Sequence, residues 1–161
     1  MWEFELSEIE KKYGALQGMA LIERALKMIE PILKKYKGTD LEDVLWIFED
    51  SDNALKSAIE IKNMFLEYNK TEEDEKWKIK VTGFGMHTGK MLFIEGTDIH
   101  WGDLVNTSSK LGQDLAKDGQ ILIMPVVYEK AFLNKELFNS LNFKKLTLKR
   151  SKVDFLCYEV T

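Results

Sequence analysis

The sequence predicts one α/β domain in which helices cover a mixed sheet. Segments whose apolar residues recur every three or four positions alternate along the chain with short apolar runs rich in strand formers. Such alternation is typical of a sheet covered by helices. The chain has 161 residues, 45% of them hydrophobic, which suits one domain with its own core. We therefore expect a single domain over residues 1–161.

The first half of the chain predicts an opening strand, a helix, a second strand and a second helix. Gly38 ends the first helix, and the apolar run Val44 to Phe48 predicts a buried strand. Ser51 or Asp52 can cap the second helix, which Asn69 ends. The buried faces of the two helices are predicted to carry Met19, Ile22, Leu26, Ile29, Leu33 and Tyr36, and then Ala54, Ala58, Ile61, Phe65 and Tyr68.

The second half predicts a hairpin, two helices and three further strands. Residues 79–87 and 91–94, separated by Thr88 and Gly89, predict the hairpin. Residues 102–117 predict a helix that buries Val105, Leu111 and Leu115. The remaining elements are a strand over 120–124, a helix over 125–133 that opens with proline, and two strands that start at 143 and 153.

Composition and charge exclude several classes of function. The net charge is −4, and the 23 basic residues are interleaved with 27 acidic ones, so we expect no nucleic-acid partner. No apolar stretch approaches the roughly 20 residues that cross a bilayer, so we expect no membrane partner. The single cysteine, Cys157, rules out an intramolecular disulfide and predicts a small buried side chain on the last strand. We therefore expect a cytoplasmic protein.

Four segments occur in the order found in the class III adenylate and guanylate cyclase domains. VLWIFEDSDNALKSAIEI resembles that family's central strand and following helix, and GFGMHTGKMLF resembles its Gly-His-Thr-Gly hairpin. WGDLVNTSSKLGQDLAKDGQILI resembles its Gly-x-x-Val-Asn helix and the next strand, and LTLKRSKVDFLCYEV resembles its closing hairpin. Four blocks in one order make a stronger signal than any single motif. The chain is therefore identified as similar to this family, as a divergent member.

The resemblance implies a fold, an assembly and a ligand. The family has a ferredoxin-like core with a mixed, mostly antiparallel sheet, so the same α/β (α+β) architecture is expected. Its members work as head-to-tail dimers, which implies a homodimer. They bind a nucleoside triphosphate with two divalent metals, Mg²⁺ or Mn²⁺, that neutralise phosphate charge and help ionise the ribose hydroxyl.

In the family, one acidic residue on the first strand and another before the central strand hold the metals. The resemblance places these roles at Glu5 and at Glu42, with Asp43 as a neighbouring candidate. Leu41 stands where the family has glycine, and Gly38 where it has a base-reading lysine. A glutamate is one methylene longer than aspartate, which matters where Mg²⁺ requires octahedral geometry. The alternative is that these residues form a solvated turn before a buried strand.

The remaining site positions come from the last two motifs. Asn106 and Lys110 match the family's transition-state asparagine and arginine, an i, i+4 pair on one helix face. Lysine keeps the charge but lacks the planar fork that grips phosphate oxygens, so weaker stabilisation is expected. Ile99 stands at the second base-reading position, which it cannot serve by hydrogen bonding, and Asp98 lies one place off. Lys149 matches the lysine that contacts the terminal phosphates.

These departures predict a cyclase-like domain with a degenerate site. It forms a dimer, can bind a nucleoside triphosphate and makes little or no cyclic nucleotide. Two alternatives stay open: an active adenylate or guanylate cyclase that uses two metals, and a structural dimerisation module that never binds nucleotide. His87 has no nucleophile or base partner in the sequence and is expected to be structural.

Overall fold

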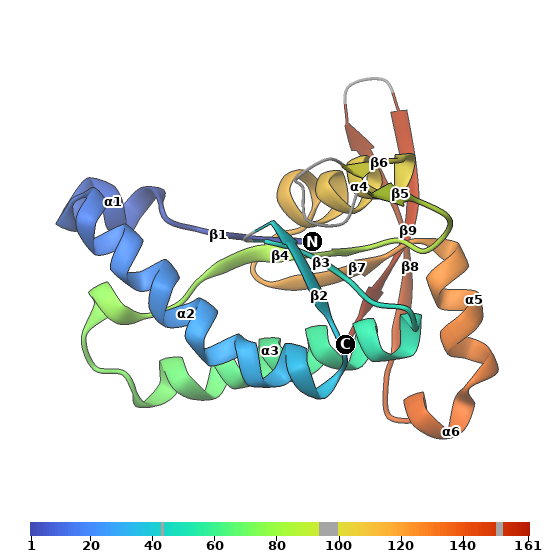
Figure 1. The fold of residues 1–161 in the computed structure, drawn as a ribbon, viewed down its shortest axis with the longest axis horizontal. Helices are drawn as coiled ribbons and strands as arrows, with labels where there is room; N and C mark the ends of the chain where they lie inside the picture. Colours follow the sequence, from blue (N-terminus) through green and yellow to red (C-terminus); the bar gives the residue numbers. More distant parts are fainter. Residues whose placement is uncertain (43, 94–99, 151–152) are drawn as a thin grey trace.

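The computed structural model describes residues 1–42, 44–93, 100–150 and 153–161. Its centre is a five-stranded sheet in the order β1-β4-β7-β9-β8 (Figure 1). Only the β4–β7 pair is parallel, and the other three pairs are antiparallel. The predicted mixed, mostly antiparallel sheet is confirmed. Its strands are β1 (Trp2–Phe4), β4 (Val81–Met86), β7 (Gln120–Ile123), β9 (Val153–Val160) and β8 (Phe143–Arg150).

Helices lie on both faces of this sheet (Figure 1). One face carries the long helices α2 (Ala15–Lys35) and α3 (Ser51–Thr71). The other carries α4 (Asp103–Ser109), which continues as a π-helical segment, η2 (Lys110–Leu115). The shorter elements are α1 (Ser7–Tyr13), the 3₁₀ turn η1 (Glu75–Trp77), α5 (Pro125–Leu133) and α6 (Lys135–Phe138).

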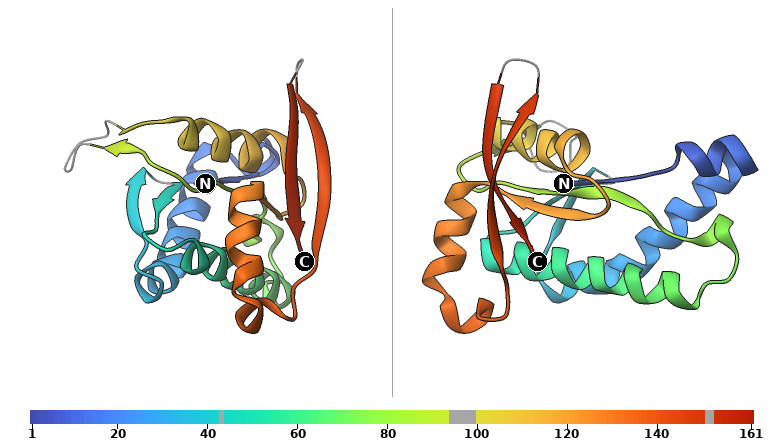
Figure 2. Two further views of the ribbon diagram at one scale, coloured as in Figure 1. Left: turned by 90° about the vertical axis from the view of Figure 1, so that its right-hand side faces the viewer. Right: turned by 180° about the vertical axis from the view of Figure 1, so that it is seen from behind.

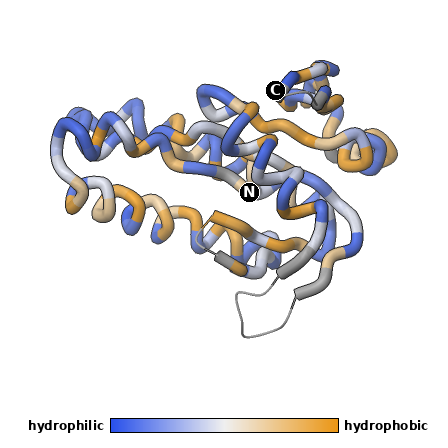
Figure 3. The backbone as a smooth tube through the Cα atoms, turned by 90° about the horizontal axis from the view of Figure 1, so that it is seen from above, coloured by the Kyte–Doolittle hydropathy of each residue, from blue (hydrophilic) through white to orange (hydrophobic). Residues whose placement is uncertain are grey.

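Strand β7 separates two hydrophobic cores. Ile121 and Ile123 belong to the larger core with α2, α3 and α5, whereas Leu122 belongs to a smaller core with Leu111 and Cys157. Successive side chains of a strand point to opposite faces, and all three β7 side chains are buried. Cys157 is therefore the small buried residue that its position predicts. Hydrophilic and hydrophobic segments alternate along the helices in Figure 3, as is typical of amphipathic helices.

Two short hairpins lie outside the main sheet. β2 (Thr39–Glu42) pairs with β3 (Leu45–Ile47), and β5 (Leu92–Phe93) pairs with β6 (His100–Trp101). The predicted hairpin between residues 79–87 and 91–94 is therefore wrong. Both edges of β4 are occupied, by β1 and by β7, so the following strand pairs elsewhere. The predicted strand at 44–48 exists, but Leu45 alone among these residues is buried.

The predicted helices need three corrections, two of their limits and one of a buried face. Asp50 caps α3, because its carboxylate accepts a hydrogen bond from the Asp52 amide at 2.9 Å. Asn69 does not end α3, which continues to Thr71. The side chain of Asn69 instead forms a hydrogen bond to the backbone of Ile79. On α2, Met19 is 65% exposed, and the buried row instead contains Leu21 and Ala25.

The helix predicted over 102–117 is α-helical only as far as Ser109. Strand β4 crosses this helix at Gly85, where an added Cβ would lie 2.0 Å from the Ser108 carbonyl oxygen and 2.4 Å from the Gly112 nitrogen. The contact requires glycine on the strand, and a second glycine faces it from η2. The two backbones therefore touch directly beside Asn106 and Lys110.

The β8–β9 hairpin extends beyond α4, as Figure 2 shows from two sides. Its strands begin at Phe143 and Val153, where the sequence predicts them. No helix in the described part of the chain is long and apolar enough to span a bilayer.

Candidate nucleotide site

Asn106 and Lys110 share the exposed side of the helix that follows Gly102. The Lys110 amide donates to the carbonyl oxygens of Asn106 and Thr107, so the two candidate side chains are still one turn apart where the π-helical segment begins. Both are exposed, whereas Thr107 and Leu111 between and beside them are buried. The predicted i, i+4 pair is thus present in the geometry.

The Lys110 side chain packs against the β8–β9 hairpin. Its ammonium nitrogen lies 5.7 Å from the centroid of the Phe155 ring, within the range of a cation–π contact. Phe155 is two residues from Cys157, so both side chains lie on the face of β9 that is turned toward η2. Lys110 is therefore held over an aromatic ring on that face.

Lys149 lies on the opposite face of the same hairpin. It pairs across the ladder with Asp154, and the two charged groups approach to 3.8 Å. Directly opposed residues of an antiparallel pair share a face, and Tyr158, which shares that face with Asp154, stacks on Tyr128 of α5 at 4.0 Å. Lys149 is 79% exposed, so the ion pair contributes little stability. The two predicted phosphate-binding lysines do not converge within one chain.

The acidic candidates lie on different sheets. Glu5 follows β1 of the main sheet, and its amide donates to the Lys80 carbonyl oxygen at 2.9 Å. Its side chain is exposed. Glu42 ends β2 and pairs with Leu45 in the separate hairpin. No group of three or more His, Cys, Asp or Glu residues in the described ranges is arranged to hold a metal ion.

Three of the predicted positions lie outside the described residues. They are Asp43, which belongs to the acidic candidates, and Asp98 and Ile99, which belong to the base-reading segment.

His87 is half-buried just after β4. Its Nδ1 accepts a hydrogen bond from the Thr88 amide at 2.9 Å, which places the proton of the neutral ring on Nε2. Burial lowers the pKa of the His87 imidazole from its ordinary value of 6.5, and the Asp103 carboxylate partly opposes that shift. The neutral ring is the form that fits this site.

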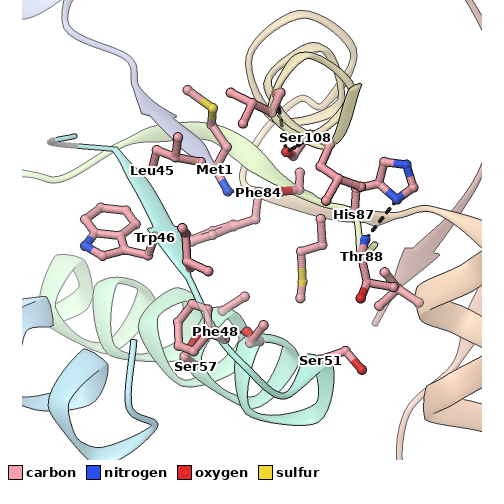
Figure 4. A pocket seen from close by; sticks show the side chains of 18 of the residues that line it. Met1, Leu45, Trp46, Phe48, Ser51, Ser57, Phe84, His87, Thr88 and Ser108 are labelled. Atoms are coloured by element: carbon pink, nitrogen blue, oxygen red, sulfur yellow. Dashed lines mark hydrogen bonds between the residues drawn. The ribbon is translucent and has the colours of Figure 1, made fainter. Parts of the chain in front are cut away.

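A cavity of about 170 Å³, which is partly open to solvent, lies between the β2–β3 hairpin, α3, the end of β4 and α4. Figure 4 shows Leu45, Phe48 and Phe84 around it, with Ser57 and Ser108 on two different walls. The sequence gives no signal for this cavity, because its lining residues come from segments that are far apart in the chain. None of the described candidates for nucleotide binding lines it.

Comparison with known proteins identifies the fold. No protein-family model matches the sequence, and no curated protein matches it significantly. Adenylate cyclases from Trypanosoma brucei in their monomeric state match with a TM-score of 0.75 and 16% identity, over 99% of this chain and 86% of that chain. The guanylate cyclase domain of RhGC from Catenaria anguillulae, in complex with GTP, matches with a TM-score of 0.68 and 18% identity, over 99% and 92%.

The adenylyl cyclase CyaB from P. aeruginosa also matches, with a TM-score of 0.64 and 15% identity over 99% of this chain and 90% of that chain. Its α/β architecture agrees with the other matches. The chain therefore has the fold of the class III adenylate/guanylate cyclase catalytic domains, as the order of its four motifs predicts.

Proposed function

We propose that this chain is a cyclase-like domain with a degenerate site, which binds a nucleoside triphosphate as a homodimer and makes little or no cyclic nucleotide. The observation that carries the proposal is the residue at position 110, which matches the transition-state arginine of the family. A lysine stands there instead of arginine, and its ammonium group lies over the Phe155 ring.

The electrostatics of the site support weak catalysis. A lysine ammonium is a point charge, so it cannot form the paired hydrogen bonds by which an arginine grips phosphate oxygens. Lys149, the second predicted phosphate ligand, lies on the other face of the β8–β9 hairpin from Lys110. Transition-state stabilisation needs donors aimed in advance at the developing charge. Two lysines on opposite faces do not meet that requirement in one chain.

The acidic residues support the same proposal. If Mg²⁺ or Mn²⁺ binds, Glu5 and Glu42 are the residues proposed to hold it, and the metal would neutralise phosphate charge. Carboxylate oxygens are suitable ligands for either ion. However, Glu5 follows a strand of the main sheet and Glu42 ends a strand of the separate hairpin. Metal binding at this pair would therefore join residues that belong to two separate sheets.

The homodimer is proposed from the neighbours of the fold. A guanylyl cyclase domain of the RhoGC fusion protein from Blastocladiella emersonii, with a TM-score of 0.68 and 17% identity, forms a non-canonical dimer. The Catenaria domain was solved with GTP, and a related catalytic core of converted specificity was solved with ATPαS. These ligands make ATP and GTP the nucleotides to test.

Thermal unfolding with and without nucleotide tests binding. ATP or GTP with Mn²⁺ should raise the melting temperature, because a ligand that binds only the folded state stabilises it. Lys110→Met, which keeps length but removes the charge, should reduce the shift. Lys117→Met, at an exposed lysine just past η2, should leave it unchanged. A flat response of the wild-type chain to both nucleotides would favour the dimerisation module without nucleotide.

Light scattering during size-exclusion chromatography tests the assembly. The proposal expects twice the mass of an 18.7 kDa chain at micromolar concentration. A monomer at all concentrations, with nucleotide present, would contradict the dimer.

A further inference from the structure

The cavity beneath the β2–β3 hairpin is large enough for a small molecule. Its volume is about 170 Å³. An apolar cavity of about 150 Å³ in another protein stays free of water and binds benzene. A single aromatic ring with one or two substituent atoms therefore fits the volume.

Most of the wall is apolar. Leu45 and Phe84 are buried side chains of β3 and β4, and Ala58 of α3 contributes a small buried side chain. Met86 and Met91 add flexible thioether side chains, which adapt to irregular shapes and pack well on aromatic rings. The wall favours an apolar ring as occupant.

Two buried serines of the wall offer hydrogen-bond acceptors. Ser57 donates its hydroxyl proton to the Ala54 carbonyl oxygen at 2.8 Å, and Ser108 donates to the carbonyl oxygens of Leu104 and Val105. Both serines are buried. A hydroxyl that has committed its proton still has lone pairs to offer. A bound molecule can therefore satisfy these oxygens only by bringing an O–H or N–H of its own.

The charge of the wall favours a neutral occupant. Among the residues that the structure describes, the titratable groups that line it are the His87 ring and the Met1 amino group. Burial lowers the pKa of both, that of the amine to about 5, so both are neutral at pH 7. A charged ligand would lose its hydration without gaining an opposite charge.

We propose that this cavity binds a neutral, single-ring aromatic molecule that carries one hydrogen-bond donor. Phenol is the simplest probe, and toluene is its isostere without the donor. The site is formed within one chain and does not depend on nucleotide binding or on the dimer.

Methionine-methyl NMR of the full chain is the direct test. Phenol should shift the Met86 and Met91 methyl resonances in a saturable way at millimolar concentration, because both side chains line the cavity. The Met19 methyl should not move, since that residue is 65% exposed on α2 and does not line the cavity. Absence of saturable shifts at Met86 and Met91 in the wild-type chain would overturn the proposal.

Two sets of variants separate filling of the cavity from hydrogen bonding. Ala58→Leu should abolish the shifts by occupying the space, whereas Ala15→Leu, at an exposed position, should not. If Ala58→Leu does not fold, Ala54→Leu on the same helix replaces it. Ser57→Ala and Ser108→Ala together should weaken phenol about three- to tenfold and leave toluene unchanged. If the wild type and a folded variant with leucine at position 58 or 54 bind phenol equally well, the proposed site is contradicted.

Discussion

Gly85 lies where strand β4 touches the helix that carries Asn106 and Lys110. A Cβ at this position would come within 2.0 Å of the Ser108 carbonyl oxygen, which belongs to backbone and cannot turn aside. Gly85→Ala should therefore lower the free energy of unfolding by about 2–3 kcal/mol or more, measured by urea denaturation. Gly18→Ala is the control, because the atoms nearest its Cβ belong to the exposed Glu10 side chain. Equal, small effects of both substitutions would contradict this packing.

His87 predicts a pH dependence of stability. Burial lowers its pKa below the 6.5 of an ordinary imidazole, so the unfolded chain takes up the proton first as the pH falls. The contribution of the neutral ring to the free energy of unfolding is thus fully present above the ordinary pKa of 6.5, and it is lost as the pH falls toward the folded-state pKa. The protonated ring also loses its acceptor for the Thr88 amide. His87 therefore destabilises the folded chain in acid.

The measurement compares melting temperatures of wild type and His87→Gln at about pH 7.5 and about pH 5.5, on either side of the imidazole range. The wild-type value should fall more on acidification, because every other titrating group is common to both chains. If the difference in melting temperature between the two chains stays constant with pH, the buried neutral ring of His87 is contradicted.

At the scale of elements, Asn69 ties α3 to the chain that enters β4. Its side-chain amide donates to the Ile79 carbonyl oxygen at 2.7 Å, and its carbonyl accepts from the Ile79 amide at 2.8 Å. Ile79 is buried, so neither backbone group can turn to water instead. Asn69→Ala should cost about 1–3 kcal/mol for each group left unsatisfied.

The matched control is Asn63→Ala, on the exposed side of the same helix. Surface substitutions of this kind change stability by less than about 0.5 kcal/mol. Urea denaturation of the two variants gives the comparison. If Asn69→Ala is no more destabilising than Asn63→Ala, the two hydrogen bonds do not hold α3 to β4.

Elements whose signals are local are predicted well from the sequence. The helix α5, which opens with Pro125, and the last two strands begin where their residues predict. The hairpin after β4 is missed because strand pairing depends on which edges distant strands occupy. Asn69 is misjudged as a helix end because its partner is in a later segment. α1 has no buried residues, so no apolar periodicity marks it.

At the scale of the whole molecule, the order of the motifs predicts the cyclase fold, but the site depends on how distant segments meet. The pair Asn106 and Lys110 is predictable because one helix carries both. Lys110 faces Phe155, whereas Lys149 faces away from it. This arrangement depends on the pairing of β8 with β9 and on the packing of η2. The cavity is lined by residues from Met1 to Val127 of α5, and it has no local signature.

The rate of cyclic nucleotide formation tests the proposed function most directly. The wild-type chain is assayed with Mn²⁺ and excess ATP or GTP, under conditions in which nucleotide raises its melting temperature. A degenerate site predicts a rate close to that of a control without protein, because the fork of an arginine is missing at Lys110. Turnover at an ordinary enzyme rate, on the order of 1 s⁻¹ or more, would contradict the account and assign an active cyclase.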